Sequence, residues 1–258
     1  MKRILSILIC LLTITVAAAD NQASFSSDQT AQIESIVKNY LLAHPEILIQ
    51  MTQKLQDQQN QQTQQQAMQG INANSTALFN PNQTAIEGNP DGTVTLVEFF
   101  DYQCVHCANM QKNQLVQKLI KANPNLRVVY KEFPIFGDNS VYAAKAAMAA
   151  NKQGKYLQMR DGIFATGKIE GSLKPSDVDA VAKAIGLNMD QYKKDIKSKA
   201  LDASVNESYQ LAQALGIQGT PAFVIAPTPK IGDSNGQITF IPGLVPADTL
   251  QQAITDAK

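Results

Sequence analysis

The sequence predicts an α/β protein whose sheet-forming parts are separated by a helical insertion and preceded by a helical arm. Two apolar runs of strand length flank a helical stretch in the first half of the chain. Two more strands and a last helix are expected at the end of the chain. Between these parts almost every segment from Ser140 to Leu215 has a helical pattern. The four expected strands lie at 93–100, 126–134, 220–226 and 237–243.

Composition excludes some functions without pointing to one. The chain has 258 residues, 44% of them hydrophobic, which is enough for a sizeable core. Lys plus Arg and Asp plus Glu both number 22, so no nucleic-acid partner or strongly anionic partner is indicated.

The first residues have the pattern of a secretory signal. Lys2 and Arg3 precede an apolar run that ends at Val16, and three alanines stand before Asp20. We therefore expect residues 1–19 to be removed, together with Cys10, and the mature chain to be a soluble periplasmic protein. A membrane anchor is the alternative for this segment, although the run is short for a bilayer.

Residues 20–73 are expected to form a helical, glutamine-rich arm and linker. Apolar residues recur at helical spacing from Asp28, Pro45 interrupts them, and a short heptad-like seam continues to Leu55. Eleven of the twenty residues from 50 to 69 are glutamine, which favours a polar helix or connector over a core element. Residues 28–69 are therefore predicted to make a homodimer, with an arm folded back on its own domain as the alternative. His44, next to Pro45, is interpreted as a helix-junction residue rather than a ligand.

The remaining chain is expected to divide into three parts. The first α/β part covers residues 74–138, with the order strand, cysteine pair, helix, strand and room for a right-handed parallel crossover. The helical insertion covers 139–205, and the second α/β part covers 206–258, ending in a helix from Ala247 to about Ala257. The almost continuous apolar run at 93–100 predicts a strand buried on both faces.

The stretch DYQCVHCANM, residues 101–110, holds the two cysteines of the predicted mature chain. A structural staple is a poor explanation, because a disulfide that closes so short a loop restrains little. A metal clip needs about four ligands, whereas the mature chain offers only two cysteines, His106 and the distant His44. We expect no metal and no bound cofactor beyond a redox-active disulfide between Cys104 and Cys107.

The position of Cys104 favours a reactive thiolate. At the start of a helix its sulfur faces unpaired backbone N–H groups and the positive end of the helix dipole, both of which lower the pKa of a thiol. His106 adds a group that can hydrogen-bond to the sulfur or carry positive charge. Cys104 is thus predicted to exchange with substrate, and Cys107, one helical turn later, to resolve the mixed disulfide.

These segments resemble the DsbA-like branch of the thioredoxin superfamily. The similarity rests on FFDYQCVHC, the helical insertion, GTPAFVI and IPGLVPADTLQQAI, and it covers about Thr93 to Lys258. It implies a thioredoxin fold interrupted by a helical domain. It also implies a cis peptide bond before Pro221 and an extended substrate peptide bound through the backbone of Thr220.

Glu98 lies in the apolar run before the cysteines, where burial would raise the pKa of its carboxyl. The resemblance implies that an acidic residue here assists proton transfer, and Lys131 on the next strand is a candidate partner. The alternative is a solvent-facing strand residue.

The resemblance implies a thiol:disulfide oxidoreductase acting on unfolded or misoxidised exported proteins, reset by a quinone-linked membrane oxidase or a membrane reductant. Val105 departs from the proline that is common in the family, so the redox potential is not transferred. Thr220 and the arm are similar to exported isomerases, so isomerisation is expected beside oxidation. The alternative is a non-catalytic envelope protein that binds peptides as a holdase or adhesin.

Overall fold

The computed structural model describes residues 25–228 and 237–258. The chain divides into two compact units, one ending at Asp57 and the other beginning at Gln58, within one long helix. The predicted signal segment, residues 1–19, lies outside the described residues.

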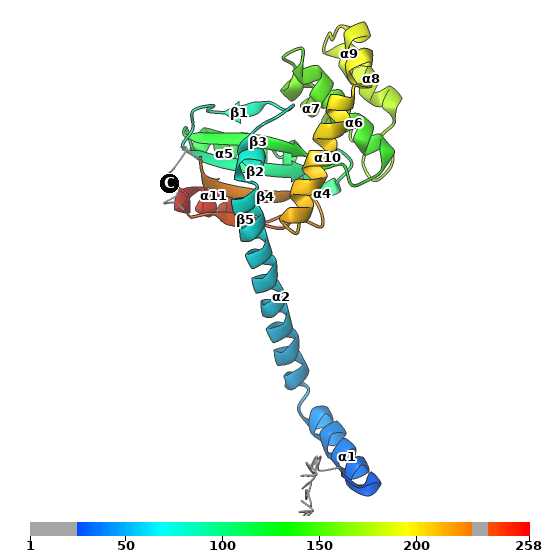
Figure 1. Ribbon diagram of the computed structural model, residues 1–258, viewed down its shortest axis with the longest axis vertical. Coiled ribbons are helices and arrows are strands. Elements are labelled where there is room, and N and C mark those ends of the chain that lie inside the picture. Colours follow the sequence, from blue (N-terminus) through cyan, green and yellow to red (C-terminus); the bar gives the residue numbers. More distant parts are fainter. Residues whose placement is uncertain (1–24, 229–236) are drawn as a thin grey trace, which may run out of the picture. The chain divides into compact units, whose positions relative to one another are not determined.

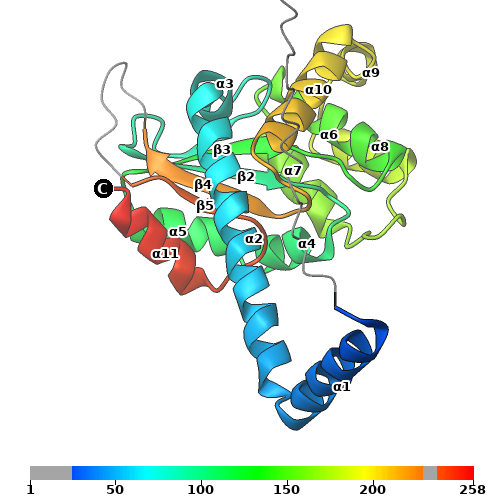
Figure 2. The same ribbon diagram turned by 60° about the horizontal axis from the view of Figure 1, so that its bottom comes forward.

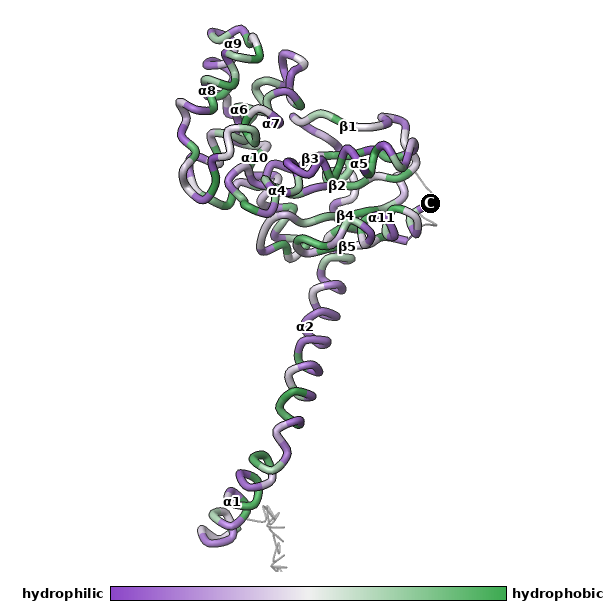
Figure 3. The backbone as a smooth tube through the Cα atoms, turned by 180° about the vertical axis from the view of Figure 1, so that it is seen from behind, coloured by the Kyte–Doolittle hydropathy of each residue, from purple (hydrophilic) through white to green (hydrophobic). Residues whose placement is uncertain are grey.

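The described part of the first unit, residues 25–57, is helical. Helix α1 (Ser27–Ala43) begins at Ser26, whose side chain and that of Gln29 form a capping box, and α2 (Glu46–Ala73) begins directly after Pro45. The predicted break at Pro45 is therefore confirmed. No residue of α1 is buried. Apolar positions recur along α1 and the first turns of α2, whereas the glutamine-rich middle of α2 is polar (Figure 3).

The second unit is built on a five-stranded sheet of order β1-β3-β2-β4-β5 (Figure 1). The strands are β1 (Ile86–Gly88), β2 (Val94–Phe100), β3 (Leu126–Glu132), β4 (Ala222–Pro227) and β5 (Thr239–Ile241). β2 and β3 are parallel, which confirms the predicted crossover, and the other neighbours are antiparallel. Every residue of β2 and β3 is buried, as predicted for β2 from its continuous apolar run. β1 was not among the expected strands.

Helices cover both faces of the sheet (Figure 2). On one face lie α4 (Val105–Lys112), α5 (Leu115–Ala122) and α11 (Ala247–Asp256). On the other lie the end of α2, α3 (Ser75–Phe79) and α10 (Lys199–Ala214). Side chains alternate along β2, so that Leu96 and Phe100 join the α4 side and Val97 and Phe99 join the α10 side.

Other sequence-based expectations also differ from the structure. The single helix expected after the cysteines is two helices, because Gln114 adopts a left-handed conformation, with φ of 54°, and separates α4 from α5. The glutamine-rich stretch is not entirely outside the core, since Ala67 is fully buried against α10 and the sheet. The boundary expected between residues 205 and 206 falls inside α10.

The insertion contributes α6 (Asp138–Asn151), α7 (Tyr156–Ala165), α8 (Pro175–Ala184) and α9 (Met189–Asp195), and it leads into α10. Of these four helices, α7, α8 and α9 pack around α6, and α7 also packs against α4 (Figure 1). The alanine-rich α6 is buried along most of its length, because small side chains allow α7, α8 and α10 to approach it closely. Within the described residues, no helix is long and apolar enough to cross a membrane.

Candidate active site

The loop between β2 and α4 is held in place by Asp101. Its buried carboxylate accepts hydrogen bonds from the backbone N–H groups of Gln103 at 2.7 Å, Ile135 at 2.6 Å and Phe136 at 3.0 Å. It also accepts one from the hydroxyl of Ser140 on α6, at 2.8 Å. The side chain of Asp101 thus connects the start of the cysteine motif, the loop after β3 and the insertion.

Cys104 is the N-cap of α4, as its place in the sequence predicts. Its sulfur accepts a hydrogen bond from the backbone N–H of Cys107 at 3.5 Å and donates one to the carbonyl of Thr220 at 3.2 Å. Both cysteines are free thiols in this structure. Hydrogen bonding by the Cys107 side chain, aided by Thr220 and the backbone N–H groups of His106 and Cys107, lowers the pKa of Cys104 to about 6 against the opposing effect of burial.

Thr220 precedes a cis peptide bond to Pro221, as the resemblance implies. Its hydroxyl oxygen is buried and has no hydrogen-bond partner among the described residues, while its side chain contributes to lowering the pKa of Cys104. A thiolate cannot donate to the Thr220 carbonyl, but it can accept from this hydroxyl. The local geometry therefore suits the ionised form of Cys104.

Cys107 has the opposite environment. It is buried, and burial raises its pKa well above the usual range, an effect reinforced by hydrogen bonding to Cys104 and by the charges of Cys104 and Glu98. The side chain of His106 is exposed, and the backbone N–H of His106 is the part that acts on Cys104. One sulfur of the pair is thus prepared as a thiolate and the other as a thiol.

Glu98 is buried on β2, which answers the alternative that it faces solvent. Burial raises the pKa of its carboxyl to about 7; the positive charge of Arg160 opposes this rise, and Glu87 and Cys104 add to it. A carboxyl with such a pKa can take up or release a proton near neutral pH.

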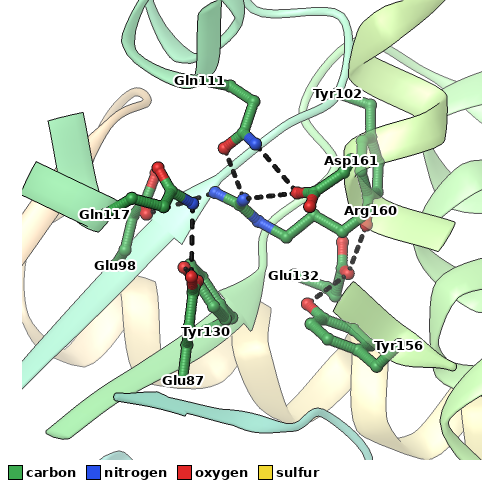
Figure 4. Close-up of polar contacts among 10 residues, drawn as sticks. All are labelled: Glu87, Glu98, Tyr102, Gln111, Gln117, Tyr130, Glu132, Tyr156, Arg160 and Asp161. Carbon is green, nitrogen blue, oxygen red and sulfur yellow. Dashed lines mark hydrogen bonds and ion pairs between the residues drawn. The ribbon is translucent and has the colours of Figure 1, made fainter. Parts of the chain in front are cut away.

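The predicted pairing of Glu98 with Lys131 is wrong. Glu98 is registered with Tyr130, so the next residue on β3 points to the opposite face of the sheet. There the Lys131 amine donates to the carbonyls of Ala77 at 2.7 Å and Asn80 at 2.6 Å, at the end of α3. The cation that meets Glu98 is Arg160 of α7, 3.5 Å away (Figure 4).

A second buried carboxyl, Glu132, lies at the end of β3. Its Oε1 accepts hydrogen bonds from the hydroxyls of Tyr102, at 2.9 Å, and Tyr156, at 2.8 Å (Figure 4). Burial raises its pKa to about 8, although the two tyrosine hydroxyls and Arg160 act in the other direction. Two acidic side chains with raised pKa values thus lie on the same face of the sheet.

Sequence reasoning missed Arg160 and Glu132. A signal for Arg160 exists, because Tyr156, Met159, Arg160 and Ile163 recur at helical spacing and the arginine thus lies on the apolar side of α7. Among the described residues, no three His, Cys, Asp or Glu side chains are arranged to hold a metal ion. The arrangement provides a thiolate, a second thiol and a titrating carboxyl, which are the groups that thiol-disulfide exchange needs.

Comparison with known proteins gives two family matches. The model of the DSBA-like thioredoxin domain matches residues 95–255, and that of the copper resistance protein ScsC N-terminal domain matches residues 29–62. The first of these covers more than half of the chain. The second covers α1 from Gln29 onward and the first part of α2.

Several solved structures are similar. BcfH of Salmonella enterica Typhimurium is 33% identical, with a TM-score of 0.73 over 89% of this chain and 96% of that one. A thioredoxin-like oxidoreductase of Silicibacter pomeroyi is 37% identical, with a TM-score of 0.59 over 69% and 94%. ScsC of Proteus mirabilis, in a transitional conformation, is 26% identical, with a TM-score of 0.60 over 90% and 98%.

Curated relatives include much longer proteins. The Na(+)/H(+) antiporter NhaA 1 of Salinispora arenicola is 27% identical over 148 residues, which are 57% of this chain and 22% of the antiporter. The corresponding antiporter of Mycobacterium sp. strain KMS is 30% identical over 151 residues, 24% of its length. The chain therefore spans less than a quarter of the length of these relatives.

Proposed function

Because the chain belongs to the family of DSBA-like thioredoxin domains, we propose that it is an exported protein-disulfide oxidoreductase that forms, and also isomerises, disulfides in other exported proteins. The observation that carries this proposal is the contrast between the two sulfurs. Cys104, with its pKa lowered to about 6, is largely ionised at neutral pH, whereas Cys107 stays protonated.

In the oxidising direction a substrate thiolate attacks Cys104 of the Cys104–Cys107 disulfide. The bond between the two enzyme sulfurs breaks, a mixed disulfide forms at Cys104, and Cys107 leaves as a thiolate that takes up a proton. The second thiolate of the substrate then attacks the substrate sulfur of the mixed disulfide, so that the substrate is oxidised and Cys104 is released reduced.

Isomerisation starts instead from reduced Cys104, which attacks a wrong disulfide and leaves after the substrate has rearranged. The electrons are carried by the cysteine pair, without a bound cofactor. A quinone-linked oxidase or a reductant in the membrane is the proposed partner that resets the pair. Ile135 and Phe136 are exposed, and Asp101, at the start of the cysteine loop, accepts hydrogen bonds from their backbone N–H groups. These two side chains and the backbone of Thr220 are the proposed contacts for the substrate peptide.

The test compares the full chain with the double variant Cys104→Ser/Cys107→Ser. The wild-type protein is expected to reduce insulin and to refold scrambled ribonuclease, and the double variant to do neither, because no sulfur remains to exchange. Thiol trapping of the protein in cells would report which redox state prevails.

The alternative, a non-catalytic peptide-binding protein on the same scaffold, predicts a different outcome. The double variant would then protect unfolded proteins from aggregation as well as the wild type does, and the wild type would show no turnover in either assay. Retained ribonuclease refolding by the double variant would contradict the oxidoreductase proposal.

We also propose that the first unit joins copies of the chain. The large apolar side chains of the heptad-like seam, which ends at Leu55, are all at least partly exposed. Val37 is 50% exposed, Leu48 56% and Leu55 56%. Such a stripe on a helix is stabilised by burial against another copy. The sequence pattern predicts two copies.

Replacing Val37 and Leu48 by glutamate is expected to convert the assembly into monomers, because each change places a charge in the seam. Sedimentation of the full chain measures the number of copies directly. The matched control is Asn39→Glu with Gln50→Glu, which adds the same charge at exposed polar positions of the same helices. Equal sedimentation of both variants and the wild type would contradict assembly through these residues.

A further inference from the structure

We propose that Arg160, which the helical insertion supplies, is a positioning residue that holds the Glu98 carboxyl ready to exchange a proton with Cys107. The inference rests on the proposed disulfide exchange, and it assigns to the insertion a part in that reaction. Glu98 lies on β2, which leads into the cysteine loop, and Arg160 lies on α7, so the pair joins two parts of the fold at one buried point.

The contacts of Arg160 link the carboxyl to the helix of the cysteines. One guanidinium nitrogen lies 3.5 Å from Glu98, and both side chains are 2% exposed. The other donates to the side-chain oxygen of Gln111 at 2.6 Å and lies 3.5 Å from Asp161. Gln111 is one helical turn after Cys107 on α4, so Arg160 touches both the strand before the cysteines and the helix that carries them (Figure 4).

A purely structural explanation accounts poorly for this geometry. The guanidinium lies over the rings of Phe100 at 5.0 Å, Tyr130 at 4.2 Å and Phe164 at 5.3 Å, which stabilise a cation. Yet its Nε has no hydrogen-bond partner among the described residues, and the ion pair with Glu98 is a single long contact. Buried ion pairs of this kind add little to stability relative to apolar side chains of similar volume.

The charged and titrating groups around this pair come from several elements. Asp161 is 54% exposed and accepts a hydrogen bond from Gln111, and Glu87 is held by the Tyr130 hydroxyl and by Gln117 (Figure 4). Among the residues that the structure describes, Arg160 is the cation that opposes the effect of burial on the pKa of Glu98. The other titrating groups near the pair are Tyr102, Cys104, Cys107, Glu132 and Tyr156.

The step in which this matters is the attack of Cys107 on a mixed disulfide. The Cys107 sulfur forms a bond to Cys104, the bond from Cys104 to the substrate breaks, and the electron pair leaves on the substrate thiolate. Cys107 must give up its proton, and an ionised Glu98 accepts it, directly or through a water molecule. In the opposite direction a protonated Glu98 returns the proton to the leaving Cys107. Arg160 therefore favours the first direction, because it favours the ionised carboxyl.

The test measures two rates in Arg160→Met as functions of pH. The reductive rate is that of the direction in which Cys107 attacks the mixed disulfide, and the oxidative rate is that of the direction in which Cys107 leaves. With the pKa of Glu98 at about 7, about half of these carboxyls are ionised at pH 7, and losing the cation raises this pKa. The reductive rate at pH 7 is then expected to fall about fivefold, whereas the oxidative rate should stay unchanged or rise less than twofold. Since the chain has no tryptophan, a peptide with one tryptophan reports each step by fluorescence.

Three variants separate this role from folding. Arg160→Lys keeps the charge and is expected to move the pH midpoint back toward that of the wild type. Arg127→Met removes another buried arginine, on the opposite face of the sheet, where it binds the carbonyl of Phe79, and should leave the pH profile unchanged. In a Glu98→Gln background Arg160→Met should shift nothing further, because the group through which it acts is gone.

The outcomes keep the two proposals apart. The role of Arg160 would be overturned if Arg160→Met lost both rates equally at every pH, or if the midpoint of its pH profile did not shift. Either result would leave the oxidoreductase proposal intact. Turnover that survives Cys104→Ser would overturn the oxidoreductase proposal itself, whatever Arg160→Met shows.

Discussion

Cys107→Ser is expected to accumulate as a mixed disulfide between Cys104 and a disulfide-containing peptide, with almost no release in the time that the wild type needs for complete turnover. Cys104 keeps its N-cap position and its contact with Thr220 in this variant, so it still attacks. The hydroxyl of serine cannot break the resulting disulfide, because it is neither ionised nor able to form a bond to sulfur under these conditions. Intact mass measurement after mixing reports the adduct.

The matched variant is Cys104→Ser, which should form no adduct and show no turnover. The remaining thiol, Cys107, is buried and its pKa is raised well above the usual range, so it reacts slowly. An adduct on Cys107 in this variant would reverse the roles assigned to the two sulfurs. Rapid release from Cys107→Ser would show that a second substrate thiol, rather than Cys107, clears the mixed disulfide.

Glu132→Leu is expected to lower the free energy of unfolding by about 2–6 kcal/mol at pH 6, because each of two buried hydroxyls left without a partner costs about 1–3 kcal/mol. The two hydroxyls are those of Tyr102 and Tyr156, and both donate to Glu132. Denaturant unfolding measures the loss. Adding Tyr102→Phe and Tyr156→Phe should recover much of it, because the buried polar groups are then removed together. A triple variant no more stable than Glu132→Leu would show that the loss comes from packing.

Glu132→Gln tests the titration of the same carboxyl. The folded-state pKa of Glu132, about 8, lies above the ordinary value of 4.5, so the folded protein holds a proton that the unfolded chain releases. The stability from this group is complete below about pH 4.5 and is lost as the pH rises to about 8. The wild type should therefore lose up to about 1.4 kcal/mol per pH unit more than the glutamine variant in this range. Parallel profiles would contradict the raised pKa.

The sequence was sufficient to predict the strands at the centre of the sheet. The run from Thr93 to Phe100 is apolar on both of its faces, and only a strand covered on both sides buries it fully. The parallel crossover followed from its connection, and Cys104 at a helix start followed from the turn between strand and helix. These features depend on residues that are close together in the sequence, so they can be predicted from it directly.

The partner of Glu98 could not be predicted in the same way. Lys131 and Glu98 lie on adjacent strands, but whether two such side chains share a face depends on the register, and a shift by one residue reverses the answer. The actual register pairs Glu98 with Tyr130. Arg160 is more than sixty residues further along the chain, and only the packing of α7 against the sheet brings it to Glu98.

The break between α4 and α5 had no clear sequence signal either. Gln114 adopts the left-handed conformation that glycine or asparagine more often takes, and Asn113 beside it would have been the more expected site. Local helix propensity gives no reason to end a helix at this position. The packing of α5 against β3 outweighs that propensity and sets the break.

The insertion is not a removable module. Ser140 binds the carboxylate that holds the cysteine loop, Tyr156 binds Glu132, and Arg160 binds Glu98, and all three belong to it. A chain shortened by joining β3 directly to α10 would keep every strand and both cysteines, yet three buried acids beneath them would lose partners. The inserted helices and the sheet therefore constrain each other's sequence, so substitutions at these contacts should be paired across the two segments.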